Sequence, residues 1–207
     1  MEFQAADVER LITLLRWRRD VRHFRPDPVP EPLIARLEQA MTLAPSVGNS
    51  RPWRVIRVED ARLRADVRDD FLRCNEAAAA GYDNERRDSY QALKLAGLDH
   101  APVQLAIFCA ADPAQGHGLG RQTMPATLEQ SVSMAVFALW LAARAQNLGV
   151  GMVSILDPAR IEALLEVPED WHFVAWLCIG WPEFQDDTPL LHRSGWQEND
   201  ETAWLTR

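Results

Sequence analysis

Hydrophobic residues recur every three or four positions in several stretches of the chain, a spacing that predicts amphipathic helices. The predicted helices cover residues 6–18, 33–41, 60–80, 85–98 and 127–146. A further short helix is expected from Asp157-Pro158 to about Leu165, because an aspartate N-cap followed by proline favours a helix start. The alternate prolines of residues 25–32 predict an extended segment, since proline fixes φ and restricts the residue before it.

Continuous apolar runs predict the strands. Val103–Ala110 (VQLAIFCA) and Phe173–Ile179 (FVAWLCI) are typical of strands that are buried on both faces. Shorter runs predict strands at 53–58 and 150–155, whereas the glycines and polar residues of 111–123 indicate a loop. We find no repeat and no linker, so the sequence predicts one α+β domain over residues 1–207.

Two regions carry more large apolar residues than a solvent-exposed element usually does. The helix predicted over 127–146 has no charge between Glu129 and Arg144. It should therefore be buried on nearly all sides, in the core or against a partner subunit. The tail, residues 182–207, carries Trp196 and Trp204 among polar residues. We expect the tail to pack on another surface, such as the partner subunit.

Composition narrows the function classes. Apolar residues make up 47% and charged residues 25% of the chain, as in globular proteins. The net charge of -8 argues against general nucleic-acid binding, and the lack of a long apolar run argues against a membrane span. The acidic start shows no secretory signal, and three cysteines without a CxxC pair suit a cytoplasmic protein. Five scattered histidines make a metal site improbable.

Five arginines fall within residues 16–25 of this otherwise acidic chain, and Asp20 lies among them. They could form a solvated basic face that complements the C-terminus of a helix. They could instead form an anion site, because guanidinium groups bind phosphate in bidentate fashion. Asp20 favours the anion site, since a carboxylate among arginines stays ionised and can be aimed at a ligand.

Two glycine-containing junctions are further candidates. In Ala44–Trp53 (APSVGNSRPW), Gly48 would let backbone N–H groups approach a planar ligand, although the segment could also be an ordinary turn. In Leu148–Ser154 (LGVGMVS), the simpler interpretation is a glycine that ends a helix and a serine in a strand. The run Gly116–Gly120 (GHGLG) lacks the spacing of a phosphate-binding loop.

Five segments in order resemble the nitroreductase-like flavoprotein superfamily and, within it, the 5,6-dimethylbenzimidazole synthase family. They are Arg18–Arg22 (RRDVR), Ala44–Ser50 (APSVGNS), Leu141–Ala145 (LAARA), Gly149–Ile155 (GVGMVSI) and Val174–Gly180 (VAWLCIG). The resemblance covers essentially the whole chain, and its most specific marks are Asp20 and Ser154. Ordinary nitroreductases tend to carry a serine where this chain has Asp20. The resemblance implies a three-layer α/β/α fold with a mixed central sheet, and an intertwined homodimer with FMN at the subunit interface.

The resemblance also implies a reaction. Reduced FMN would be bound as a substrate and fragmented with O2 to 5,6-dimethylbenzimidazole, the lower ligand of vitamin B12, and erythrose 4-phosphate. A flavin reductase would supply reduced FMN, because the chain shows no nicotinamide fingerprint. One alternative is an NAD(P)H-dependent nitroreductase or flavin reductase that retains FMN. Another is a carrier that binds flavin without changing it.

The roles of single residues follow from the same resemblance. Asp20 would act as general base or orienting carboxylate, and Ser154 as a hydrogen-bond partner of the flavin. Residues 74–98 would form a lid that excludes water, and Arg51 would either help to bind phosphate or point to solvent. The expected FMN-binding residues are Arg18, Arg19, Asp20, Val21, Arg22, Ser46, Val47, Gly48, Asn49, Val150, Gly151, Ser154 and, in the tail, Arg193.

Overall fold

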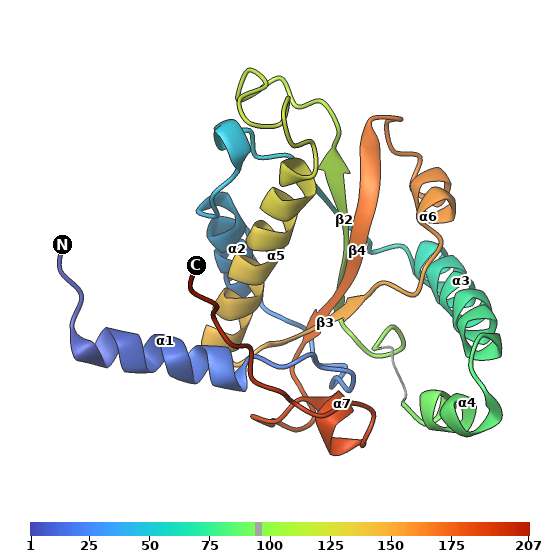
Figure 1. Cartoon of the computed structure of the whole chain (residues 1–207). Coiled ribbons are helices and arrows are strands. Elements are labelled where there is room, and N and C mark those ends of the chain that lie inside the picture. Colours follow the sequence, from blue (N-terminus) through green and yellow to red (C-terminus); the bar gives the residue numbers. More distant parts are fainter. Residues whose placement is uncertain (94–96) are drawn as a thin grey trace.

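The computed structural model describes residues 1–93 and 97–207, and its centre is a four-stranded sheet (Figure 1). The strands are β1 (Trp53–Arg57), β2 (Val103–Ala110), β3 (Gly149–Val153) and β4 (Trp171–Gly180), in the order β1-β2-β4-β3. All three strand pairs are antiparallel. An isolated parallel bridge between Asp20 and Val150 lies beside β3, and among the residues that the structure describes it is the one parallel pairing of the predicted mixed sheet.

Helices lie on both sides of the sheet (Figure 1). One side is covered by α2 (Glu31–Thr42) and α5 (Thr127–Ala145), and the other by α3 (Ala61–Ala80) and α6 (Pro158–Leu164). The remaining helices are α1 (Ala5–Trp17), α4 (Asn84–Gln91), α7 (Leu190–Arg193) and the 3-10 turn η1 (Val47–Asn49). The predicted α+β class and three-layer fold are therefore confirmed.

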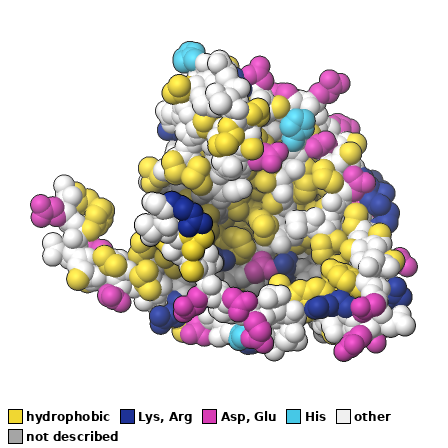
Figure 2. Space-filling model, in the orientation of Figure 1, with side chains coloured by type: hydrophobic (Ala, Val, Ile, Leu, Met, Phe, Trp, Pro, Cys, Tyr) yellow, Lys and Arg dark blue, Asp and Glu magenta, His cyan; other side chains and the backbone are white. Residues whose placement is uncertain are grey.

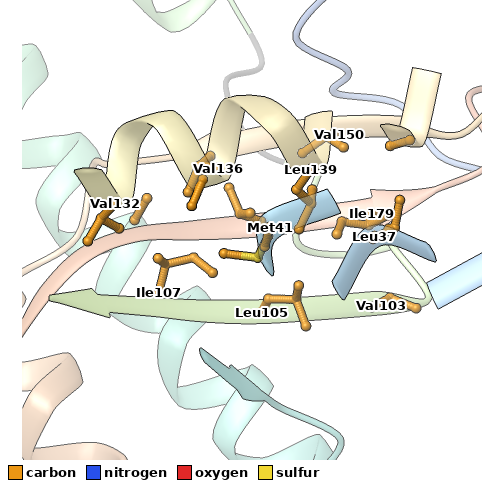
Figure 3. Packing of buried hydrophobic residues seen from close by; sticks show 14 of the residues in the cluster. Leu37, Met41, Val103, Leu105, Ile107, Val132, Val136, Leu139, Val150 and Ile179 are labelled. Atoms are coloured by element: carbon orange, nitrogen blue, oxygen red, sulfur yellow. The ribbon is translucent and has the colours of Figure 1, made fainter. Parts of the chain in front are cut away.

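The main core fills the space between α2, α5 and the sheet (Figure 3). Val132, Val136 and Leu139 of α5 point toward β2 and β4, where they meet side chains such as Ile107 and Ile179. Every residue of β2 is buried, as its continuous apolar run predicts. This packing fixes α5 firmly against the sheet, and the functional candidates lie near its two ends.

The structure differs from the predicted elements at several boundaries. Strand β3 ends at Val153, so Ser154 lies outside the strand predicted over 150–155, and β4 begins at Trp171 instead of Phe173. Helix α2 begins at Glu31, because proline at position 32 is tolerated in the first helical turn. Helix α4 ends at Gln91 instead of residue 98, and residues 94–96 of that predicted helix lie outside the described residues. Within one chain, Met134 and Phe137 are exposed on the outer face of α5, so burial of that face against a partner subunit stays a prediction.

The three cysteines are free, and Cys109 and Cys178 are buried. Burial raises the pKa of the Cys109 thiol to about 11 and that of Cys178 to about 12. Both therefore remain protonated at neutral pH and behave as small hydrophobic side chains. Among the described helices, none combines the length and the apolar character that crossing a bilayer requires.

Candidate functional site

The arginine-rich segment after α1 lies along the outer edge of β3. The Val21 N–H donates to the Val150 carbonyl (3.0 Å), and the Met152 N–H donates to Oδ1 of Asp20 (2.9 Å). Because β3 is an edge strand, these two bonds occupy backbone groups that would otherwise face solvent. The backbone thus holds Asp20 in place beside β3.

The two glycines of β3 make this close approach possible. A Cβ atom on Gly151 would lie 2.2 Å from the Val21 carbonyl oxygen, and one on Gly149 would lie 2.7 Å from the Val21 side chain. Just after α5, Asn147 (φ 62°) adopts the left-handed conformation that often ends a helix. Gly149 lies in β3, so the interpretation that this glycine ends the helix is wrong. The glycines of β3 instead leave room for the segment that carries Asp20.

The tail closes over this segment and forms a small cavity with it. Its main lining residues are Arg19, Asp20, Val21, Arg22, Arg144, Phe184, Gln185, Asp186, Thr188 and Arg193. The cavity measures about 40 Å³, whereas one water needs about 10–15 Å³ in the same measure. It could therefore hold a group the size of a phosphate but not a flavin ring. Figure 2 shows this face hollowed beside α5, with charged side chains at the bottom of the hollow.

The cavity carries a surplus of positive charge. Four arginines and two aspartates line it. Two of the arginines form ion pairs with the two aspartates, Arg22 with Asp20 and Arg193 with Asp186. The other two arginines donate to neutral oxygen atoms, Arg19 to the Asp187 carbonyl (2.8 Å) and Arg144 to the Gln185 amide (2.8 Å). Burial, followed by the charge of Arg18, lowers the pKa of Arg19. A surplus of two positive charges suits a phosphate monoester, which carries about −1.5 to −2 at neutral pH.

Asp20 is held through both carboxylate oxygens. Oδ1 accepts the Met152 N–H, and Oδ2 forms the ion pair with Arg22. The side chain is 34% exposed at the rim of the cavity. Burial raises the pKa of Asp20 above 3.8, although Arg22 and the Met152 hydrogen bond oppose this effect. The arrangement suits a carboxylate that orients Arg22 and can take up a proton.

Arg18 does not line the cavity with its neighbours. Its guanidinium lies over the rings of Trp140 (5.2 Å to the centroid) and Phe137 (5.5 Å) on α5. Its Nε atom is buried and has no hydrogen-bond partner among the described residues. The predicted arginine cluster is thus divided between the cavity and the outer face of α5.

Ser154 follows directly after β3 and is exposed. It lies two positions beyond Met152, whose N–H binds Asp20. Within the described residues its hydroxyl makes no hydrogen bond to another protein group, so it is available to a ligand. Its neighbour Ile155 packs against Ala79, Tyr90 and Leu93 of the α3–α4 region.

The Ala44–Trp53 junction forms a rigid turn. The Val47 N–H donates to the Ser131 hydroxyl of α5 (3.0 Å), and the Arg51 N–H donates to the Ser46 hydroxyl (3.0 Å). Gly48 (φ 55°) and Asn49 (φ 54°) both have left-handed backbones. A Cβ atom on Gly48 would lie 3.1 Å from the Gly116 carbonyl oxygen, so this glycine allows close contact with the loop at 111–123. Arg51 is exposed.

The structure does not bring this turn to the arginine cavity within one chain. Ser131 binds the turn near the start of α5, whereas Arg144 lines the cavity near its end. Thirteen positions of a helix span about 20 Å. Figure 1 shows η1 and the segment before α2 at opposite ends of α5. The predicted FMN-binding residues therefore form two separate groups in a single subunit.

Several residues around the cavity were not predicted from the sequence. Arg144, Gln185 and Asp186 contribute to it through contacts between α5 and the tail. A signal for Arg144 was present, because it is the charge that ends the uncharged stretch of α5. The tail residues gave no such signal, since their positions depend on how the chain returns to the sheet.

Comparison with known proteins identifies the family. A family model described as "Nitroreductase family" matches residues 15–181. The chain belongs to the nitroreductase family. It is 60% identical over 207 residues to a Rhodobacter capsulatus protein named 5,6-dimethylbenzimidazole synthase, with full coverage of both chains. A Rhodospirillum rubrum protein of the same name is 57% identical over 187 residues, which is 90% of this chain and 89% of that protein.

Solved structures of this family share the fold. An oxidized iodotyrosine deiodinase bound to FMN and 3-iodo-L-tyrosine superposes with a TM-score of 0.72 at 23% identity, covering 95% of this chain and 97% of the other. A BluB-like flavoprotein from Clostridium difficile 630 has a TM-score of 0.66 at 16% identity, with 95% and 94% coverage. At these identities the likeness establishes the fold alone.

Proposed function

We propose that this enzyme is a 5,6-dimethylbenzimidazole synthase of the oxidoreductase class. Its reaction is the O2-dependent fragmentation of reduced FMN to 5,6-dimethylbenzimidazole and erythrose 4-phosphate, and the pyrimidine ring of the flavin leaves with the oxygen atoms of O2 as a third product. The reaction supplies the lower ligand of vitamin B12. The observation that carries this proposal is the 57–60% identity, over nearly the whole chain, to relatives of that name. The cavity beside β3 supports it, because its charge and size suit the phosphate of FMN.

The arginines of the cavity hold the phosphate end of the substrate. Arg19 and Arg144 form no ion pair with a carboxylate among the described residues, while Arg22 and Arg193 can share their guanidinium groups between an aspartate and a phosphate. The pairing of Arg193 with Asp186 fixes the tail as one wall of the cavity. The phosphate thereby sets the position of the rest of the molecule.

Asp20 and Ser154 act on the part of the substrate outside the cavity. The reaction breaks bonds near the ribityl C1′ carbon, so a proton acceptor must lie close to it. Asp20 is the carboxylate at the rim of the cavity, and its raised pKa lets it accept a proton more readily than an ordinary aspartate does. The exposed Ser154 hydroxyl, two positions beyond the Met152 N–H that binds Asp20, offers a hydrogen bond to the substrate. Reduced FMN supplies both the carbon skeleton and the electrons for O2.

A second copy of the chain completes the site. The cavity has no room for the flavin ring, and the turn Ser46–Asn49 lies about 20 Å away along α5. The uncharged outer face of α5, with Met134 and Phe137 exposed, and the exposed apolar residues of α1 suit burial in a homodimer. In this dimer the turn of one chain faces the arginine cavity of its partner and contacts the flavin ring.

The last residues of the tail bind the partner subunit. Residues 197–207 have no helix or strand of their own, and Trp204 and Leu205 are almost fully exposed. On the sheet, β1 is an edge strand, and an apolar groove of about 620 Å³ lies between it and α2. Exposed tryptophan and leucine at the end of one chain fit such a groove on the other.

The proposal also covers the source of reduced FMN, the lid over the site and the compartment in which the enzyme works. A flavin reductase provides reduced FMN, and the α3–α4 region within residues 74–98 forms a lid that keeps water away from the reaction. Three free cysteines fit a reducing compartment such as the cytoplasm.

The test is direct. The purified protein is mixed with chemically reduced FMN, air is admitted, and mass spectrometry follows 5,6-dimethylbenzimidazole. The product should form with the protein and be absent without it. If only oxidised FMN returns, the proposal is wrong, and steady turnover of NAD(P)H with a nitroaromatic compound would identify an ordinary nitroreductase.

A further inference from the structure

An aromatic cluster joins the tail to the α3–α4 region. The Trp196 ring packs edge-on against Tyr82 (5.7 Å between centroids) and lies 6.1 Å from Tyr90. The Arg86 guanidinium lies 5.0 Å from the centroid of the Trp196 ring. Two aromatic contacts and one cation–π contact thus connect a single tail residue to the middle of the proposed lid.

The lid side of this contact is well ordered by its own bonds. The Tyr90 hydroxyl donates to Oδ1 of Asn75 on α3 (2.7 Å), which ties α4 to α3. Arg87 donates to the carbonyls of Ala79 (3.1 Å) and Tyr82 (3.2 Å) at the end of α3. These bonds make the α3–α4 turn a preformed platform, on which Trp196 rests.

The tail side connects the same tryptophan to the phosphate cavity. Trp196 lies three residues after Arg193, which lines the cavity and pairs with Asp186 (2.6 Å). Gly195 turns the chain with φ 72°, and the Trp196 N–H donates to the Leu191 carbonyl (2.9 Å). Because α7 and this turn are short and hydrogen-bonded, Arg193 and Trp196 must move together.

The cluster also reaches the candidate site residue Ser154. Ile155, the next residue, packs against the same buried side chains of the α3–α4 region that Trp196 covers, among them Tyr90. A change in the packing of Trp196 therefore alters the surroundings of Ile155, and through it the position of the Ser154 hydroxyl.

We propose that Trp196 is a positioning residue that fastens the lid to the wall of the phosphate cavity and so holds Ser154 at the reacting part of the substrate. Binding of the phosphate at Arg193 steadies α7, and α7 carries Trp196 against Tyr82 and Tyr90. Closure of the lid is thereby coupled to occupation of the cavity. This inference rests on the proposed function, because it assigns the lid to the flavin reaction.

The test compares Trp196→Ala and Trp196→Phe with the matched control Gln197→Ala, an exposed neighbour outside the cluster. In single turnovers at saturating reduced FMN, Trp196→Ala should lower the yield of 5,6-dimethylbenzimidazole about tenfold and raise hydrogen peroxide correspondingly. Trp196→Phe should restore most of the yield, and Gln197→Ala should match the unmodified chain. The affinity for reduced FMN should change less than threefold in all variants, since the arginines remain. An unchanged partition between product and peroxide in Trp196→Ala would overturn the proposal.

Hydrogen exchange tests the coupling between the phosphate cavity and the lid independently of the proposed synthase activity. In the full chain, inorganic phosphate should slow exchange in residues 84–91, and Trp196→Ala should abolish that protection. If the unmodified chain makes no dimethylbenzimidazole, the proposed function fails, and the exchange measurement still decides about the coupling. Equal protection by phosphate in Trp196→Ala and the unmodified chain would show that the tail does not hold the lid.

Discussion

At the scale of single residues, Asp20 has two functions that the same contacts explain. Its carboxylate binds the Met152 N–H on β3 and the Arg22 guanidinium at the cavity, so it anchors the segment to β3 and, in the proposed reaction, is the proton acceptor. Asp20 is partly exposed at the rim of the cavity, and its pKa is raised. In both respects it differs from a carboxylate in a buried salt bridge that only stabilises the fold.

Asp20→Asn should therefore abolish catalysis with little effect on the fold. The amide oxygen can still accept the Met152 N–H, whereas the charge and the proton acceptor are lost. We expect the yield of dimethylbenzimidazole to fall about 100-fold or more, as for other general bases, with reduced FMN still bound. Product yield and binding titrations check this, and full activity in the variant would remove Asp20 from the mechanism.

The same substitution tests the sign of the pKa shift. Because the folded state holds the Asp20 proton more tightly than the unfolded chain does, the free energy of unfolding should fall as pH rises from 3.8 through the raised pKa. Asp20→Asn should lack this part of the pH dependence. Denaturant unfolding of both proteins across acidic pH measures it, and superimposable pH curves would mean that the Asp20 pKa is not raised.

Arg22→Gln should move the pH dependence of catalysis. Arg22 is the largest influence that lowers the pKa of Asp20, so its removal should raise that pKa further. If ionised Asp20 is required, the yield falls on the acidic side, and in the variant this fall should occur at higher pH. The yield is measured at saturating reduced FMN so that weaker phosphate binding does not interfere. If the yield fell at the same acidic pH in Arg22→Gln as in the unmodified chain, the role of ionised Asp20 would be contradicted.

Ser154→Gly tests the hydroxyl beside β3. The side chain is exposed, so stability should change by no more than about 0.5 kcal/mol. We expect reduced FMN to bind and its reaction with O2 to yield hydrogen peroxide in place of dimethylbenzimidazole. Peroxide and product are quantified from the same turnover, and an unchanged product yield would leave the serine a structural role only.

At the scale of elements, hydrophobic periodicity was enough to predict almost every helix and strand. It does not separate burial in the core from burial against a partner, because the uncharged sequence of α5 fits a core helix as well as a helix at an interface. The end of α4 at Gln91 was missed, since periodicity alone does not mark where a short surface helix stops. The arginine-rich segment 16–25 could be recognised from the sequence as a candidate anion site. The tail residues that form the other wall of the cavity could not, because their position depends on the tertiary fold.

The glycines of β3 give an element-scale prediction. In Gly151→Ala the new Cβ would meet the Val21 carbonyl at 2.2 Å, and the segment that carries Asp20 would have to move. We expect a loss of about 1–3 kcal/mol in the free energy of unfolding, together with weaker FMN binding. Gly81→Ala is the control, because its Cβ would have an ordinary contact of 3.4 Å. Equal stability of the two variants would contradict the close packing of the segment on β3.

At the scale of the whole molecule, the account depends on two copies of the chain. One subunit holds the arginine cavity and the Ser46–Asn49 turn at opposite ends of α5, which agrees with the FMN site at a subunit interface that the sequence resemblance implies. Spacing along the chain indicates which residues belong to a site, but not which subunit provides them. In the proposed dimer, the exposed faces of α1 and α5 and the end of the tail are the surfaces that meet the partner subunit.

Removal of residues 198–207 tests the dimer. If the end of the tail binds the groove between α2 and β1 of the partner, the shortened chain should dissociate at concentrations where the full chain is dimeric. Light scattering after size-exclusion chromatography measures the mass, and dimethylbenzimidazole yield should fall with the dimer. A full-length chain that is monomeric while active would refute the shared site, and a dimeric shortened chain would refute the role of the tail.

The most direct test of the central claim is a balance of products from one equivalent of reduced FMN. The protein and the reduced flavin are mixed in equal amounts without oxygen, O2 is added, and 5,6-dimethylbenzimidazole and returning FMN are quantified together by mass spectrometry. Our account predicts dimethylbenzimidazole in proportion to the FMN lost, none before O2 is added, and almost none with Asp20→Asn. Complete recovery of FMN, with O2 converted only to hydrogen peroxide, would contradict it.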